Sequence, residues 1–320
     1  MATADAAAKP IRLTQPDKDI KSQSPTQRVI RRFTRHRAAM FGLVILVAVI
    51  LYIVVGSFIF SEAQSNFNDT AIRLQPPSAE HPFGTDRIGR DILSRTIYGG
   101  QISLLIGFLA VIVEVGFGTA IGAVAGYYGG WIDAVLMRIT EAMLSIPQLL
   151  LLLVMAKFFG EKIPSITFLG RTFSGSVVVI ILILGLTSWM SLARIIRSNV
   201  LSLKETEFIL AARAIGVPNW KIIVNHILPN TMASIIVSLT LGVATAILTE
   251  AYVSFLGLGV QAPTASWGNM LTEAQEFTVI KNAPWYWFFP SLLILLTVLS
   301  INFVGDGLRD AFDPRSDNKV

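Results

Sequence analysis

The sequence predicts an all-α membrane protein with six transmembrane helices, and two observations carry this prediction. Of the 320 residues, 53% are hydrophobic and only 15% are charged, a balance found in membrane proteins rather than in soluble domains. Six apolar stretches are long enough to cross a hydrocarbon layer of about 30 Å at about 1.5 Å per residue. The chain contains no cysteine, which excludes disulfides and thiolate ligands.

Residues 1–38 are expected to form a tail outside the membrane, because they lack a long apolar run. The end of this tail, residues 28–37, reads RVIRRFTRHR and places five arginines directly before the first predicted span, residues 39–61. Such a cluster can bind nucleic acid or lipid headgroups, but positive charge beside a span is also the usual orientation signal. We interpret the cluster as an orientation signal, and we expect membrane lipid but no nucleic acid as a partner.

Residues 62–100 form a predicted external loop that ends in the stretch HPFGTDRIGRDILSR. We expect a glycine-rich turn followed by an amphipathic helix on the membrane surface, beginning near Asp91. His81, Asp86 and Asp91 could together bind a metal ion, but the glycine and proline punctuation favours a folded loop, so we predict no metal site. The residues singled out in this loop are His81, Gly84, Asp86, Gly89, Arg90 and Asp91.

The remaining predicted spans are residues 101–125, 133–158, 173–193, 231–255 and 285–304. Gly118, Gly122 and Gly126 recur every four residues in the second span, a spacing that lets two helix backbones approach closely. Pro147 lies inside the third span and is expected to kink it. The predicted segments between and after these spans are a short loop at 159–174, an external loop at 256–284 and a tail at 305–320.

Glu114 and Glu250 lie within or near the predicted hydrocarbon zone. An ionisable side chain there costs a few kcal/mol on insertion scales, so a functional role is the first hypothesis for each. Each carboxylate could line a translocation path or pair with a polar residue of a neighbouring helix. For Glu250 we favour a role in structure or gating.

Residues 199–230 are predicted to form a helical hairpin between two apolar spans. Residues 203–215 favour a helix, Gly216 is expected to end it in a left-handed conformation, and Pro218 suits the first turn of a second helix. Pro229 and the asparagine after it are expected to separate this helix from the next span. Lysine and arginine are concentrated on the side that holds this hairpin and both termini, which predicts that this side is cytoplasmic.

Four stretches of the chain carry a family resemblance. Ala211-Ala212, Gly216 and the HILP sequence ending at Pro229 resemble the EAA loop of ATP-binding-cassette (ABC) importer permeases, although Leu210 and His226 stand where the family usually has Glu and Ile. The loop at 81–91, TEAYVSFLGLG around Glu250 and GDGLRDAFDPR at 305–315 are similar to signatures of one permease subunit of oligopeptide, dipeptide and nickel importers. The residues implied in coupling to an ATPase are Glu207, Ala211, Ala212, Gly216, Pro218, Leu228 and Pro229.

The resemblance implies the fold of a type I importer permease in a bacterial or archaeal inner membrane. It also implies a heterodimer with a homologous permease, two cytoplasmic ATP-binding subunits that hold ATP and magnesium, and an extracytoplasmic substrate-binding protein. The glycine face of the second span is our candidate contact with the second permease. This chain lacks G-x-x-x-x-G-K-[ST], so we expect no cofactor and no enzymatic activity in it.

Di- or oligopeptides are the substrates that the resemblance favours, and nickel or another small solute is the alternative. A different class, an ion-coupled secondary transporter that uses Glu114 and Glu250, predicts inverted repeats, which we do not find in the sequence.

Overall fold

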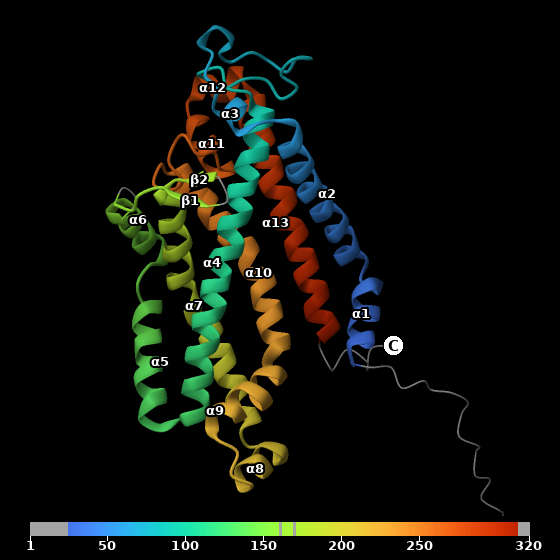
Figure 1. The fold of residues 1–320 in the computed structure, drawn as a ribbon, viewed down its shortest axis with the longest axis vertical. Helices are drawn as coiled ribbons and strands as arrows, with labels where there is room; N and C mark the ends of the chain where they lie inside the picture. Colours follow the sequence, from blue (N-terminus) through green and yellow to red (C-terminus); the bar gives the residue numbers. More distant parts are fainter. Residues whose placement is uncertain (1–24, 160–161, 169–170, 313–320) are drawn as a thin grey trace, which may run out of the picture.

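The structure is a computed structural model that describes residues 25–159, 162–168 and 171–312, and these residues are almost entirely helical (Figure 1). The predicted tail residues 1–24 and 313–320 lie outside the described residues. Within the described residues, five helices are long and apolar enough to cross a membrane, or six if a sharply bent pair counts as one span. The five are α2 (Arg37–Ile59), α4 (Ile92–Tyr128), α7 (Gly175–Leu203), the run Asn219–Phe255 that ends in α10 (Leu228–Phe255), and α13 (Pro284–Phe312).

The long helices lie side by side along one axis of the molecule (Figure 1). α8 (Glu207–Ala214) is at one end, which we call the α8 end, and α12 (Phe277–Asn282) is at the other, which we call the α12 end. α1 (Pro25–Arg35) is separated from α2 by His36, whose Nδ1 accepts a hydrogen bond from the Ala39 amide at 3.1 Å and so caps α2. α2 packs along α13.

α4 is one continuous helix, which corrects the prediction of a separate surface helix before a span at 101–125. The Asp91 carboxylate accepts the Ser94 amide hydrogen at 2.8 Å and caps the helix at its start. The first turns are not exposed on a membrane surface, because Ile92 and Arg95 are buried beneath the loop that carries α3 (Glu62–Asn66), the short 3₁₀ turn Thr70–Ile72 and, on the other side, α11 (Trp267–Glu273). The segment that was predicted to be an amphipathic surface helix is therefore the buried, partly polar start of α4.

The predicted third span is two helices, α5 (Gly130–Leu144) and α6 (Gln148–Phe159), with an angle of 83° between them. Pro147 causes the break, since proline lacks an amide hydrogen and restricts the residue before it to extended backbone. The predicted loop at 159–174 contains a short antiparallel hairpin of β1 (Ile166–Phe168) and β2 (Arg171–Phe173). Apart from this hairpin, the all-α prediction is correct.

α7 is longer than the predicted span at 173–193 and runs in parallel beside α4. The glycine face of α4 lies against it: a Cβ added to Gly122 would be 2.4 Å from the Ala193 carbonyl oxygen, and one added to Gly118 would be 2.9 Å from that of Trp189. Gly126 similarly faces Val200. The face that we expected to contact a second permease is thus occupied by a helix of the same chain.

The second arm of the hairpin runs into α10 without a break. α9 (Asn219–Ile222) continues through a π-helical turn (Ile223–Ile227) into α10, contrary to the predicted separation at Pro229. A proline inside an α-helix removes one hydrogen bond and its ring collides with the carbonyl four residues earlier. The wider π-turn, closed by the Leu228 amide on the Ile223 carbonyl, accommodates Pro229, and the Asn230 side chain donates to the His226 carbonyl at 2.6 Å.

Candidate functional site

The hairpin at the α8 end is closed by a glycine in a left-handed conformation. Gly216 has φ +81°, and its amide donates to the Arg213 carbonyl at 3.0 Å. The Val217 amide donates to the Ala212 carbonyl at 3.1 Å, which completes a Schellman motif. The first arm is shorter than the predicted helix 203–215, because residues 204–206 form a turn in which Thr206 Oγ1 donates to the Leu203 carbonyl at 2.6 Å.

One side of the hairpin is fixed to the helices beneath it. Ala212 and the buried side chains Ile209, Ile222 and Ile227 join a core cluster formed with α4 and α7. The Tyr127 hydroxyl of α4 donates to Asn219 Oδ1 at 2.8 Å, and the Arg213 guanidinium lies 4.9 Å from the centre of the Tyr127 ring. The hairpin is therefore held rigidly in place and does not swing freely from the bundle.

The other side of the hairpin exposes large apolar side chains. Phe208 is 46% exposed, Ile215 81% and Trp220 60%. Leu210, which stands in place of the usual family Glu, is also exposed. Several large apolar side chains exposed on one short hairpin are typical of a site of protein–protein contact. Of the residues predicted for coupling, Ala212 is buried and Leu228 half-buried, whereas Glu207, Ala211, Gly216, Pro218 and Pro229 are exposed.

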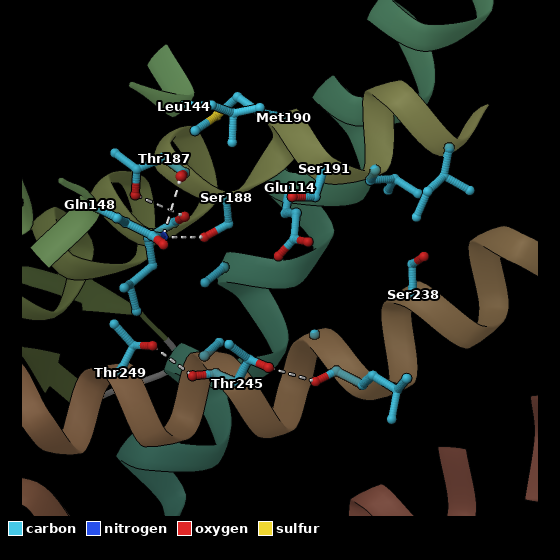
Figure 2. Close-up of a pocket in the computed structure, with 17 residues that line it drawn as sticks. Glu114, Leu144, Gln148, Thr187, Ser188, Met190, Ser191, Ser238, Thr245 and Thr249 are labelled. Carbon is cyan, nitrogen blue, oxygen red and sulfur yellow. Dashed lines mark hydrogen bonds between the residues drawn. The ribbon is translucent and has the colours of Figure 1, made fainter. Parts of the chain in front are cut away.

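A second feature is a cavity of about 330 Å³ among the long helices, lined by both apolar and polar side chains (Figure 2). Glu114 projects into it from α4, and it is the only carboxylate among the lining residues. Gln148 of α6 donates from Nε2 to the Thr187 carbonyl at 3.3 Å and to Ser188 Oγ at 3.2 Å. The remaining polar lining residues are Ser191 of α7 and Ser238, Thr245 and Thr249 of α10.

Glu250 lies outside this cavity and is fully buried. Its carboxylate accepts hydrogen bonds from Ser103 of α4 at 3.0 Å and from Ser254 at 2.7 Å. The two serine oxygens in turn accept the backbone amides of Trp267 at 3.2 Å and Val260 at 3.1 Å. Glu250 therefore fastens the loop that follows α10 to α4 at the α12 end.

The loop at 81–91 is built around another buried carboxylate. Asp86 accepts the backbone amides of Ile88 and Arg90, each at 2.9 Å, and the Arg90 guanidinium lies 2.5 Å away. His81 Nδ1 instead lies 3.0 Å from Asp91 Oδ1. Of the three side chains considered for a metal site, His81 and Asp91 therefore contact each other, whereas Asp86 contacts Arg90.

Glycines allow the same loop to pack tightly. Gly84 and Gly89 have positive φ angles, and a Cβ on Gly89 would overlap the Asp69 carbonyl. The loop is thus a folded, internally paired structure at the start of α4.

Most of the cavity wall was missed by reasoning from the sequence. The hydroxyl residues Ser238, Thr245 and Thr249 are spaced by seven and four, which puts them on one face of a helix. This polar stripe inside an apolar span is the signal that could have located the cavity. Which helices face each other across it follows only from the tertiary structure.

A bundle of apolar helices around a polar cavity, with an exposed helical hairpin at one end, defines the class of multi-pass membrane transport subunits. Comparison with known proteins narrows this class. The chain belongs to the family of binding-protein-dependent transport system inner membrane components, whose model matches residues 118–318. Residues 24–77 match a second model, the N-terminal transmembrane domain of oligopeptide transport permease C.

Relatives of known function extend over nearly the whole chain. A dipeptide transport system permease protein, DppC, of Alkalihalophilus pseudofirmus is 42% identical over 94% of this chain and 93% of its own length. The oligopeptide transport system permease protein OppC of Bacillus subtilis is 38% identical over 92% of this chain and 91% of its own length.

A solved structure shares the fold. The MetNI methionine ABC transporter in an inward-facing conformation contains a chain that superposes with a TM-score of 0.53 at 19% identity, covering 69% of this chain and 98% of that one. The predicted type I importer permease fold is therefore confirmed.

Proposed function

We propose that this chain forms one half of the translocation path of an ATP-driven peptide importer and couples to separate ATPase subunits through the α8 hairpin. The observation that carries the proposal is the apolar surface on a rigidly mounted hairpin at the far end of the bundle. Phe208 lies in α8 and Ile215 directly follows it, at the extreme α8 end of the molecule (Figure 1), and Trp220 is exposed in the adjoining α9. A protein partner is the occupant that such a surface needs.

The energy source must lie outside this chain under this proposal. The two ATP-binding subunits would hold ATP and magnesium on the cytoplasmic side, and this chain would carry no enzymatic activity. The arginine-rich α1 and the hairpin lie at the same end of the bundle (Figure 1), which supports a cytoplasmic α8 end under the positive-inside rule. A homologous second permease would close the path, and an extracytoplasmic binding protein would deliver substrate at the α12 end.

Peptides are the proposed substrates, and the membrane is the inner membrane of a bacterium or archaeon. The relatives support this choice, since they are named for dipeptide and oligopeptide transport. Glu114 and the hydroxyl groups around it give the path a polar wall that suits the amide groups of a peptide better than an apolar solute.

The test is ATP hydrolysis and subunit attachment in the purified complex, with the variant Gly216→Pro. Proline fixes φ near −65° and has no amide hydrogen, so it is incompatible with φ +81° and with the bond to the Arg213 carbonyl. We expect the ATPase subunits to dissociate or hydrolysis to become independent of the binding protein. Ala212→Asp, which buries a charge in the hairpin, should act in the same direction.

Gly257→Pro provides a matched control at the opposite end. Gly257 follows α10, has φ +79° and donates its amide to the Ser254 carbonyl at 2.9 Å, so the backbone damage is equivalent. We expect the ATPase subunits to stay attached to this variant. Transport driven by an ion gradient and unaffected by Gly216→Pro would refute the proposal.

A further inference from the structure

Glu114 is placed differently from two other acidic side chains of the helical bundle, Asp133 and Glu250. Asp133 of α5 forms a two-point ion pair with Arg197 of α7, at 2.5 and 2.6 Å, and Glu250 accepts two serine hydroxyls. Within the described part of the chain, the Glu114 carboxylate has neither a hydrogen bond nor an ion pair, and no lysine or arginine lines its cavity. It projects into open space between α4 and α10 (Figure 2).

An unpaired carboxylate at this depth favours a cationic ligand. A charge held away from bulk water interacts strongly with an opposite charge, because the surroundings screen it weakly. The carboxylate also reaches across to α10, since a Cβ on Gly242 would lie 3.5 Å from Glu114 Oε2. A cation at this point would therefore contact both walls of the cavity.

The cavity suits an organic cation rather than a metal ion. Its volume of about 330 Å³ is within the range of small-molecule sites, about 300–1,000 Å³. Calcium and magnesium are bound by several oxygen ligands around one point, whereas here a single carboxylate faces hydroxyls spread along α7 and α10. Hydroxyl groups in two rows can donate to and accept from successive peptide groups.

A second cavity of about 720 Å³ lies toward the α8 end and shares Ser191 and Ile195 with the first. Its charged lining residues are Arg194, Arg197 and Glu141. Arg197 is paired with Asp133 and Glu141 with Arg138, so within the described chain Arg194 is the one of the three without an ion pair. Gly122 of α4 is level with Ala193, because their backbones are in contact, so Arg194 lies eight helical residues, or about 12 Å, below Glu114. An extended peptide covers that distance with three to four residues.

We propose that Glu114 binds the positively charged amino end of the transported peptide, with the peptide chain directed toward Arg194. The inference rests on the proposed function and adds the recognition site and the orientation of the cargo. It makes this chain itself selective for a free amino terminus.

The absence of cysteine from the chain allows a direct test of the charge at the cavity. Ser238→Cys places one thiol on the cavity wall, in the complete complex with its ATPase subunits in lipid vesicles. The rates of reaction with a cationic and an anionic methanethiosulfonate reagent are compared, and the product is read from the mass of this chain. We expect a preference for the cationic reagent that falls about tenfold when Glu114→Gln is added.

Asp310→Asn is the matched control for the loss of one carboxylate. Asp310 is exposed on α13 and lies 3.4 Å from His36, outside the cavity. The preference for the cationic reagent should survive this change. No preference in the complete complex would overturn the inference, because it would mean that a partner subunit neutralises Glu114.

Protection of the same thiol by peptide identifies the ligand. Trialanine, added without the external binding protein, should slow labelling, whereas N-acetyl-trialanine should not, and Glu114→Gln should abolish the difference. Equal protection by both peptides would overturn the role of the amino end. ATP-driven uptake of trialanine by the same vesicles, now supplied with the external binding protein, tests the proposed function separately: uptake without protection rejects the site alone, and no uptake rejects the function.

Discussion

Glu114 and Glu250 are the same residue type in neighbouring long helices, yet their surroundings are opposite. Glu250 is enclosed at the α12 end, where two serines donate to it and two backbone amides complete the network. Glu114 faces a cavity and has no such partners in the described chain. A carboxylate whose acceptor positions are filled holds a structure together, whereas one left open is available to a ligand.

The largest expected effect on stability is that of Glu250→Ala. The change leaves two buried hydroxyls without their acceptor and opens a void, so we expect the free energy of unfolding to fall by about 3 kcal/mol. Denaturant titration of the purified protein in detergent measures it. Glu114→Ala, assayed in parallel, should cost less than about 1 kcal/mol. Equal losses of unfolding free energy would show that the two carboxylates contribute equally to stability, contrary to the comparison made above.

The two sides of α4 provide a second comparison. Gly122→Ala places a methyl group against the Ala193 carbonyl, whereas Gly116 has open space around it. Overpacking between α4 and α7 should cost about 1–3 kcal/mol, while Gly116→Ala should be neutral or stabilising by up to about 1 kcal/mol, because alanine restricts the unfolded chain. The same titration distinguishes them, and destabilisation by Gly116→Ala would show that this side of α4 is covered in the complex.

Hydroxyl groups near the two carboxylates allow a finer test of the difference between the enclosed Glu250 and the open cavity at Glu114. Ser254→Ala removes a donor to Glu250 and an acceptor for the Val260 amide, and it should cost about 1–2 kcal/mol. Thr245 lines the cavity, and in the described chain its hydroxyl donates only to the Leu241 carbonyl of its own helix, at 3.2 Å. Thr245→Ser retains the hydroxyl and should leave the free energy of unfolding unchanged within about 0.5 kcal/mol.

Glu114→Gln should change the free energy of unfolding as little as Thr245→Ser, within about 0.5 kcal/mol. Peptide uptake by reconstituted vesicles should nevertheless slow markedly, because the charge that holds the cargo is lost. Loss of stability and uptake together, in equal proportion, would instead identify Glu114 as a structural residue.

Hydropathy was sufficient to place the long helices, but it misplaced several of their ends. Arg95 was assigned to a separate amphipathic helix on the membrane surface, yet it is buried in the first turns of α4. α7 likewise continues past the apolar run to Leu203, since arginine, leucine and serine do not end a helix by themselves. Charged residues indicate where a helix leaves the lipid. The helix itself ends only where other partners replace its backbone hydrogen bonds.

The hairpin was easier to predict than the cavity. Gly216 acts locally, so its left-handed conformation follows from a few neighbouring residues. Glu250 is instead bonded to Ser103, which is 147 residues away in the sequence. No local pattern contains such a contact, and the same holds for the hydroxyl groups that meet Glu114 across the cavity. The sequence could name both carboxylates as candidates but could not separate their roles.

The uninterrupted helix from α9 through the π-turn into α10 has a mechanical consequence. The run Asn219–Phe255 contains 37 residues and is therefore about 55 Å long. One of its ends belongs to the exposed hairpin, and its middle carries Ser238 and Thr245 on the cavity wall. A rigid rod of this length amplifies small rotations: a tilt of about 5° about one end displaces the other by about 5 Å. A small rotation of this helix about the exposed hairpin would therefore become a displacement of several ångström at the α12 end of the bundle.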